Sequence, residues 1–122
     1  MNRGIDALVV AGAAGAAVHA VLAPEHLREW APLGASFAAG AAVLAVGAVA
    51  LALRPSDRRV AGAVACVLAV FVAGYVTTRL TALPPLDPDR EAFDVLGICT
   101  TAIEAAGLLL AFPRPLTRGG RR

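Results

Sequence analysis

The sequence predicts an all-α integral membrane protein, a four-helix bundle whose helices run up-down-up-down. Two observations predict this fold class. Hydrophobic residues make up 58% of the 122 residues, whereas a soluble domain contains about 45–50%. These residues fall into four long runs that are separated by proline and charged residues. Because a span needs about 20 residues, four spans occupy nearly the whole chain, and we expect one transmembrane domain over residues 1–122.

The first two runs are expected to form a hairpin in the membrane. The first span covers residues 5–23 and ends at Pro24, and the second covers residues 31–53 and ends at Arg54. Proline and charge are typical of chain that leaves hydrocarbon. The segment Val18-His19-Ala20 also resembles a signal-peptide cleavage site, but the 19-residue length of the first run favours a membrane span.

The last two runs predict a second hairpin. One span covers residues 60–82 and ends before Pro84-Pro85, and the other covers residues 92–112 and ends at Pro113. Alanine and glycine are frequent in all four runs. Small residues let helix backbones approach closely in lipid, so we expect a narrow, tight bundle without a wide cavity.

The distribution of arginine predicts that both termini are cytoplasmic. Lysine is absent, and three of the eleven basic residues lie in the loops after the first and third spans. The other eight lie in the amino terminus, the middle loop and the carboxyl tail, at Arg3, Arg54, Arg58, Arg59, Arg114, Arg118, Arg121 and Arg122. Positively charged segments stay inside. The arginine, alanine and glycine bias is typical of a GC-rich genome, so we expect a bacterial cytoplasmic membrane.

Glu104 is the polar residue that most needs a reason, because it lies near the middle of the fourth predicted span. An ionisable group there costs about 2.5–3.5 kcal/mol on insertion scales. Thr100, Thr101 and Tyr75 are its nearest candidate partners. Glu104 is expected either to carry a proton or a cation, or to donate a hydrogen bond that locks two helices together.

A second polar group is expected at the outer ends of the spans. Arg79 and Asp94 lie at similar depth at the two ends of one loop, so we expect a salt bridge between them. Trp30 fits the aromatic belt at a membrane interface.

Two imidazoles and two carboxylates of this outer region form a candidate site for a transition metal. These are His19, His26, Glu29 and Asp94, and imidazole together with carboxylate suits copper, zinc or iron. His26 and Glu29 would share one side of the loop if that loop were helical. No other cofactor is predicted.

The chain resembles a group of uncharacterised, short four-helix membrane proteins of high-GC Gram-positive bacteria. The residues that carry the resemblance are His19, His26-Leu27-Arg28-Glu29-Trp30, Arg79, Leu83-Pro84-Pro85, Asp94 and Glu104. It implies that these polar positions form one site or one lock, and it implies no activity. Size and helix count also resemble the small multidrug transporters, but their essential carboxylate lies in the first span, so their mechanism is not carried over.

The function predicted from the sequence is that of an accessory or binding component of a membrane complex. Its expected partners are the lipid bilayer and other membrane subunits or a second copy of the chain. Nucleic acid is not expected, because the basic residues are dispersed. No catalytic constellation is present in the sequence, so an enzyme is not favoured. The alternatives are a proton-coupled transporter of a small solute that uses Glu104, and an outward-facing metal-binding protein.

Overall fold

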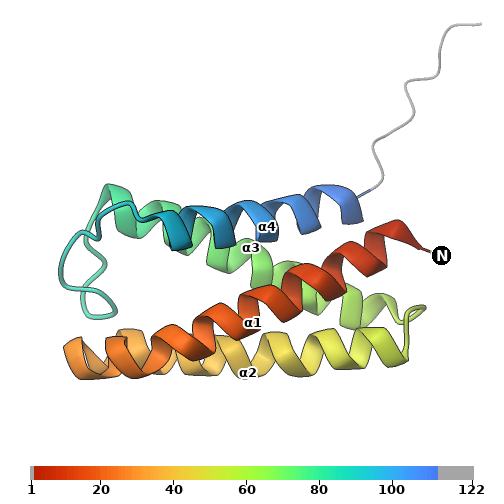
Figure 1. Cartoon of the computed structure of the whole chain (residues 1–122), viewed down its shortest axis with the longest axis horizontal. Helices are drawn as coiled ribbons and strands as arrows, with labels where there is room; N and C mark the ends of the chain where they lie inside the picture. Colours follow the sequence, from red (N-terminus) through yellow and green to blue (C-terminus); the bar gives the residue numbers. More distant parts are fainter. Residues whose placement is uncertain (1, 113–122) are drawn as a thin grey trace, which may run out of the picture.

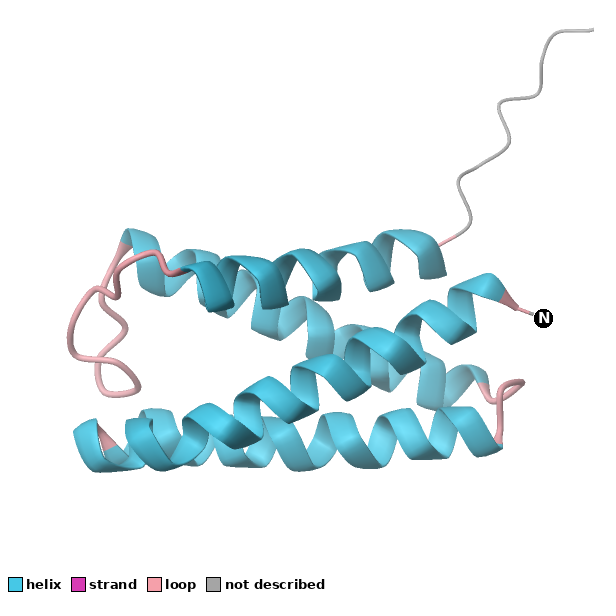
Figure 2. Cartoon of the chain, in the orientation of Figure 1, coloured by secondary structure: helices cyan, strands magenta, loops and turns pink. Residues whose placement is uncertain are grey.

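The computed structural model describes residues 2–112, and this part of the chain folds into four α-helices (Figure 1). The helices are α1 (Arg3–Glu29), α2 (Ala31–Leu53), α3 (Arg58–Leu80) and α4 (Val95–Ala111). The described residues between them form turns and one longer loop, with no strand apart from an isolated bridge between Leu83 and Asp87 (Figure 2). The predicted all-α class is confirmed.

Three of the four helices are long and apolar enough to cross a membrane. These are α1, α2 and α3, with 27, 23 and 23 residues. Helix α4 is apolar but has 17 residues, and at about 1.5 Å per residue it is about 25 Å long, shorter than the hydrocarbon core of about 30 Å. These lengths indicate a membrane protein.

Helix α1 is longer than predicted, because it continues through Pro24 to Glu29. The prediction of a polar loop after residue 23 was therefore wrong. Proline removes one backbone hydrogen bond, but membrane helices tolerate it where neighbouring groups compensate. The helix ends at Trp30, whose backbone is extended and whose N–H donates to the carbonyl of His26 at 2.7 Å. Trp30 alone connects α1 to α2, which has the predicted bounds.

Side-chain caps set the starts of α3 and α4. The Asp57 carboxylate accepts the N–H groups of Arg59 and Val60, so α3 begins at Arg58, two residues earlier than predicted. The Asp94 carboxylate accepts the N–H of Gly97 at 2.6 Å, so α4 begins three residues later than predicted. Such caps satisfy the free N–H groups of a first turn.

Small residues pack the helices closely at the end where Asn2 and the last turn of α4 lie. A Cβ added at Gly107 would collide with the Cβ of Ala11 and would lie 3.2 Å from the carbonyl of Ala7. Fully buried leucines, among them Leu44 and Leu68, continue this core. The bundle is narrow here, as predicted.

The opposite end is wider, so the prediction of a tight bundle without a cavity was wrong. The turn at Trp30 and the loop of residues 81–94 both lie at this end, which we call the loop end (Figure 1). A cavity of about 690 Å³ opens there between the helices. The arginines of the tail that enter the prediction of orientation, Arg114, Arg118, Arg121 and Arg122, lie outside the described residues.

Candidate functional site

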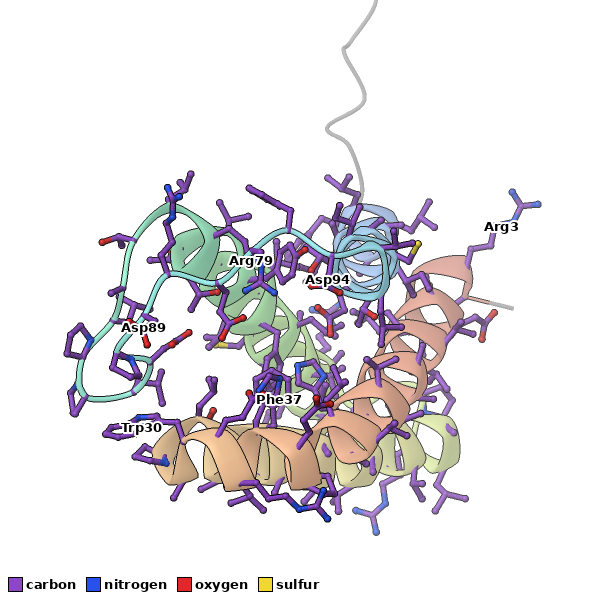
Figure 3. All side chains as sticks on the ribbon, turned by 60° about the vertical axis from the view of Figure 1, so that its left-hand side comes forward. Arg3, Trp30, Phe37, Arg79, Asp89 and Asp94 are labelled. Carbon is purple, nitrogen blue, oxygen red and sulfur yellow. The ribbon has the colours of Figure 1, made fainter. Side chains whose placement is uncertain are left out.

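The cavity at the loop end is lined by residues of all four helices and of the loop 81–94. Its volume of about 690 Å³ lies within the range of about 300–1,000 Å³ that small-molecule sites occupy. Figure 3 brings this end forward and shows Arg79 and Asp94 on one side of the opening and Phe37 on the other. All nine candidate residues named from the sequence line it: His19, His26, Glu29, Tyr75, Arg79, Asp94, Thr100, Thr101 and Glu104.

His19 and Glu104 meet at the inner end of the cavity. Both residues line the cavity far from the loop end of their helices, His19 in α1 and Glu104 in α4. Both are buried, with exposed fractions of 7% for His19 and 2% for Glu104. The His19 Nδ1 and the Glu104 Oε1 are 4.0 Å apart. His19 Nδ1 also lies 2.7 Å from the Gly15 carbonyl, so this nitrogen carries the proton and donates it to the backbone.

The pairing of His19 with Glu104 was missed from the sequence, which placed His19 with the outer residues and Glu104 alone at mid-membrane. The depth of each residue was estimated along its own helix, and that estimate does not include the angle at which α1 and α4 cross. Gly15 was the available signal. A Cβ at this position would lie 2.7 Å from the Glu104 Oε1, so the missing side chain makes room for the carboxyl group.

Aromatic rings surround the imidazole of His19. The ring centroid of Phe71 lies 4.0 Å from that of His19, and the centroid of Phe37 lies 5.0 Å away. Phe37 also contacts the ring of His26. Neither phenylalanine was singled out from the sequence. The one indication in the sequence was Gly40, a small residue that leaves room for a large neighbour. A Cβ added there would collide with the ring of Phe71.

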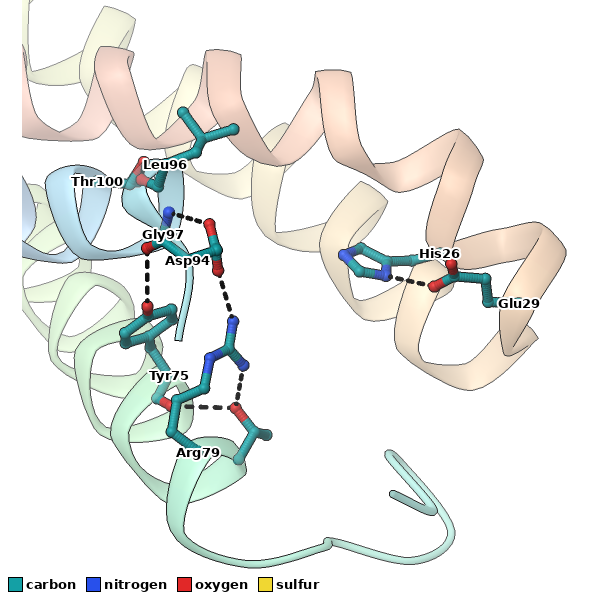
Figure 4. Close-up of polar contacts among 9 residues, drawn as sticks. His26, Glu29, Tyr75, Arg79, Asp94, Leu96, Gly97 and Thr100 are labelled. Carbon is teal, nitrogen blue, oxygen red and sulfur yellow. Dashed lines mark hydrogen bonds and ion pairs between the residues drawn. The ribbon is translucent and has the colours of Figure 1, made fainter. Parts of the chain in front are cut away.

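Arg79 and Asp94 form the expected salt bridge, with 3.1 Å between Nη2 and Oδ2 (Figure 4). The Arg79 guanidinium lies over the Tyr75 ring, 4.2 Å from its centroid, and Nη1 donates to Thr78. The Tyr75 hydroxyl donates to the Asp94 carbonyl at 3.4 Å. Tyr75 therefore belongs to this outer cluster and not beside Glu104. Thr100 likewise bonds the Leu96 carbonyl of its own helix.

The carboxylate of Asp94 precedes α4 and is held in its charged form. The N–H of Gly97 donates to it, and the Arg79 guanidinium adds a hydrogen bond and a positive charge. The bond from Gly97 is the larger of these effects, and together they lower the pKa of Asp94 from its ordinary value in spite of the opposing effect of burial. This carboxylate and this guanidinium neutralise each other.

The four candidate metal ligands are divided between separate pairs. His26 and Glu29 are one helical turn apart near the end of α1, with 3.3 Å between Nδ1 and Oε2. His19 pairs with Glu104, and Asp94 pairs with Arg79. Within residues 2–112, no group of three or more His, Cys, Asp or Glu side chains is placed to hold one ion. The geometry therefore does not favour the metal hypothesis.

The loop 81–94 is fastened over the cavity by contacts that the sequence did not reveal. Trp30 Nε1 donates to the Pro85 carbonyl at 2.7 Å, and Leu83 and Asp87 exchange two backbone hydrogen bonds. Asp87 is one of the residues that line the cavity, and it is 2% exposed. The site therefore contains two buried carboxyl groups. That of Asp87 belongs to the loop, and that of Glu104 lies between the helices.

No protein-family profile, curated protein or solved structure matches this chain. The function therefore has to be argued from the cavity and from the residues that line it.

Proposed function

We propose that this protein crosses the membrane four times, with both termini in the cytoplasm, and binds a small solute in the cavity at its loop end. The cavity of about 690 Å³ carries the proposal, because all four helices and the loop 81–94 contribute to its lining and the lining residues are both apolar and ionisable. In the proposed orientation the loop end faces outward. The solute then enters from outside and reaches Glu104 and His19 at the inner end.

Cavity-filling variants test solute binding with a matched control. Gly74 and Gly62 both lie in α3, and an added Cβ at either position meets no atom within 4 Å. Of these two glycines, Gly74 lines the cavity and Gly62 does not. A leucine at Gly74 should therefore fill the cavity without a backbone clash, whereas a leucine at Gly62 should leave it open.

Calorimetric titration of the full chain in phosphatidylcholine nanodiscs, with empty discs as the blank, measures this binding. The probes are three phenols of matched shape: 3-tert-butylphenol, (3-hydroxyphenyl)trimethylammonium and 3-hydroxybenzenesulfonate. We expect saturable binding of at least one probe, its loss in Gly74→Leu and its retention in Gly62→Leu. Absence of saturable binding in the wild type, or retention in Gly74→Leu, would overturn the proposal.

Proton-coupled transport of the solute is a second candidate function, supported by the His19–Glu104 pair. Both side chains can take up and release a proton, and their polar atoms are 4.0 Å apart at the inner end of the cavity. Two such groups at this distance influence each other's protonation. A solute that arrives beside them can therefore displace a proton.

Proteoliposomes that contain a pH-sensitive dye test this candidate. The wild type should move protons when a gradient of the bound probe is applied, and Glu104→Gln should not, while its thermal unfolding stays close to that of the wild type. The exposed acid Asp6 offers a control, because Asp6→Asn should behave as the wild type. If the wild type moves no protons, transport is refuted. If Glu104→Gln unfolds, Glu104 is a structural lock between helices.

The role of accessory component in a larger membrane complex is the alternative that the sequence favoured. It predicts a stable partner, or a second copy, that co-purifies with the full chain after mild solubilisation. The cavity supports binding by this chain, because residues of all four helices and of the loop 81–94 line it.

A further inference from the structure

The lining of the cavity is strongly acidic. Arg79 is its single arginine, and the only other basic side chains among its lining residues are the two histidines. Six of its lining residues carry a carboxyl group, namely Glu25, Glu29, Asp87, Glu91, Asp94 and Glu104. Clefts lined by one sign of charge concentrate ligands of the opposite sign. An anionic solute would therefore meet an excess of acidic groups in this cavity.

Arg79 does not offset that excess, because it is already paired. Its guanidinium bonds Asp94 at 3.1 Å and Thr78 at 3.0 Å and lies over the ring of Tyr75. Its Nε has no hydrogen-bond partner within the described chain, but its charge is balanced by Asp94. After this pair is set aside, the remaining ionisable groups are five carboxyls and two imidazoles.

Two of the five carboxyls have an oxygen with no partner. Glu104 and Asp87 are each 2% exposed, and Glu104 Oε1 and Asp87 Oδ2 make no hydrogen bond within residues 2–112. A buried polar atom without a partner is costly, so such atoms mark places where a missing partner belongs. Both residues line the cavity, Glu104 from α4 and Asp87 from the loop 81–94.

The rest of the lining favours an apolar body on that partner. Phe37, Phe71 and Tyr75 line the cavity together with aliphatic residues of three helices. Aromatic faces attract organic cations. A bare metal ion fits poorly, because no three potential ligands in the described part of the chain converge on one point.

We infer that the solute of the proposed binding function is a monovalent organic cation with an apolar body, held between the carboxyl groups of Glu104 and Asp87 and the aromatic rings of the cavity. The inference rests on that function and adds the chemical class of the ligand. The cationic group lies beside a carboxylate, and the apolar body lies against Phe37 and Phe71.

Titration of the three matched phenols into nanodiscs that contain the full chain tests the ligand class. The cation (3-hydroxyphenyl)trimethylammonium and the neutral 3-tert-butylphenol differ in charge and hardly in shape. We expect the cation to bind the wild type at least about 10-fold more tightly than the neutral phenol, because burying a charge beside an unpartnered carboxylate is selective. The sulfonate should not bind.

Single substitutions then assign the selectivity to the two carboxyls. Glu104→Gln and Asp87→Asn should each weaken cation binding at least about 10-fold more than they weaken binding of the neutral phenol. Far-ultraviolet circular dichroism of each variant reports whether it folds. Asp89→Asn is the control, because Asp89 lies in the same loop, is exposed and does not line the cavity (Figure 3).

The outcomes separate this inference from the proposed function. Equal binding of the cation and the neutral phenol, or cation binding that neither substitution weakens, would overturn the cation inference while solute binding stands. If none of the three phenols binds saturably, the proposed function falls, and the inference falls with it.

Discussion

Replacement of Gly34 by alanine should destabilise the α1–α2 hairpin. Trp30 alone connects the two helices, so the end of α1 and the start of α2 lie close together. A Cβ at Gly34 would collide with the backbone nitrogen and Cα of Leu27, and also with its Cγ. Backbone atoms cannot move aside as a flexible side chain can. The added methyl group must therefore push α1 and α2 apart at the turn.

The size of the effect follows from comparison with Gly62→Ala in α3. Overpacking by a methyl group costs about 1–3 kcal/mol, and alanine gains about 0.8–1.0 kcal/mol over glycine in a helix interior. Gly62 has no atom within 4 Å of an added Cβ, so that variant shows only the gain. To a first approximation the gain cancels between the two variants. We therefore expect Gly34→Ala to be less stable than Gly62→Ala by about 1–3 kcal/mol.

Unfolding by sodium dodecyl sulfate in mixed micelles, followed by far-ultraviolet circular dichroism, measures the two free energies of unfolding. The wild type should lie between the variants, with Gly62→Ala slightly more stable. If Gly34→Ala unfolds at the same denaturant fraction as Gly62→Ala, the close approach of α1 and α2 at the turn is refuted. A loss of stability in both variants would contradict the cancellation on which the magnitude rests.

Two further predictions concern the loop end. Because Gly97 and Arg79 lower the pKa of Asp94, its charged form stabilises the fold above the ordinary carboxyl pKa, and that contribution is lost as the pH falls through the lowered value. The melting temperatures of the wild type and Asp94→Asn should therefore converge below about pH 4, and a gap that widens in acid would contradict this. Trp30→Phe removes the 2.7 Å bond to the Pro85 carbonyl, so we expect a loss of about 0.5–1.5 kcal/mol and faster amide hydrogen exchange at Leu83 and Asp87; unchanged exchange would show that this bond does not hold the loop.

Features that depend on a single helix or on one loop could be predicted from the sequence. The bounds of α2 were correct, since an uninterrupted apolar run between Trp30 and Arg54 leaves little choice. The Arg79–Asp94 salt bridge was expected because its partners lie at the two ends of one loop, at similar depth. The end of α1 and the starts of α3 and α4 were predicted less accurately, because a polar cap or a proline within a helix does not follow from hydropathy.

By itself, the sequence determined that the chain is helical, that most of its helices suit a membrane, and which polar residues required partners. Only the tertiary structure decided which side chains are the partners of these polar residues. Hydropathy reports how apolar a segment is, but it contains neither the rotation of a helix about its axis nor the angle at which two helices cross. Those two quantities determine that His19 lies beside Glu104 and that Tyr75 lies beside Arg79. They also determine that a cavity is present at the loop end.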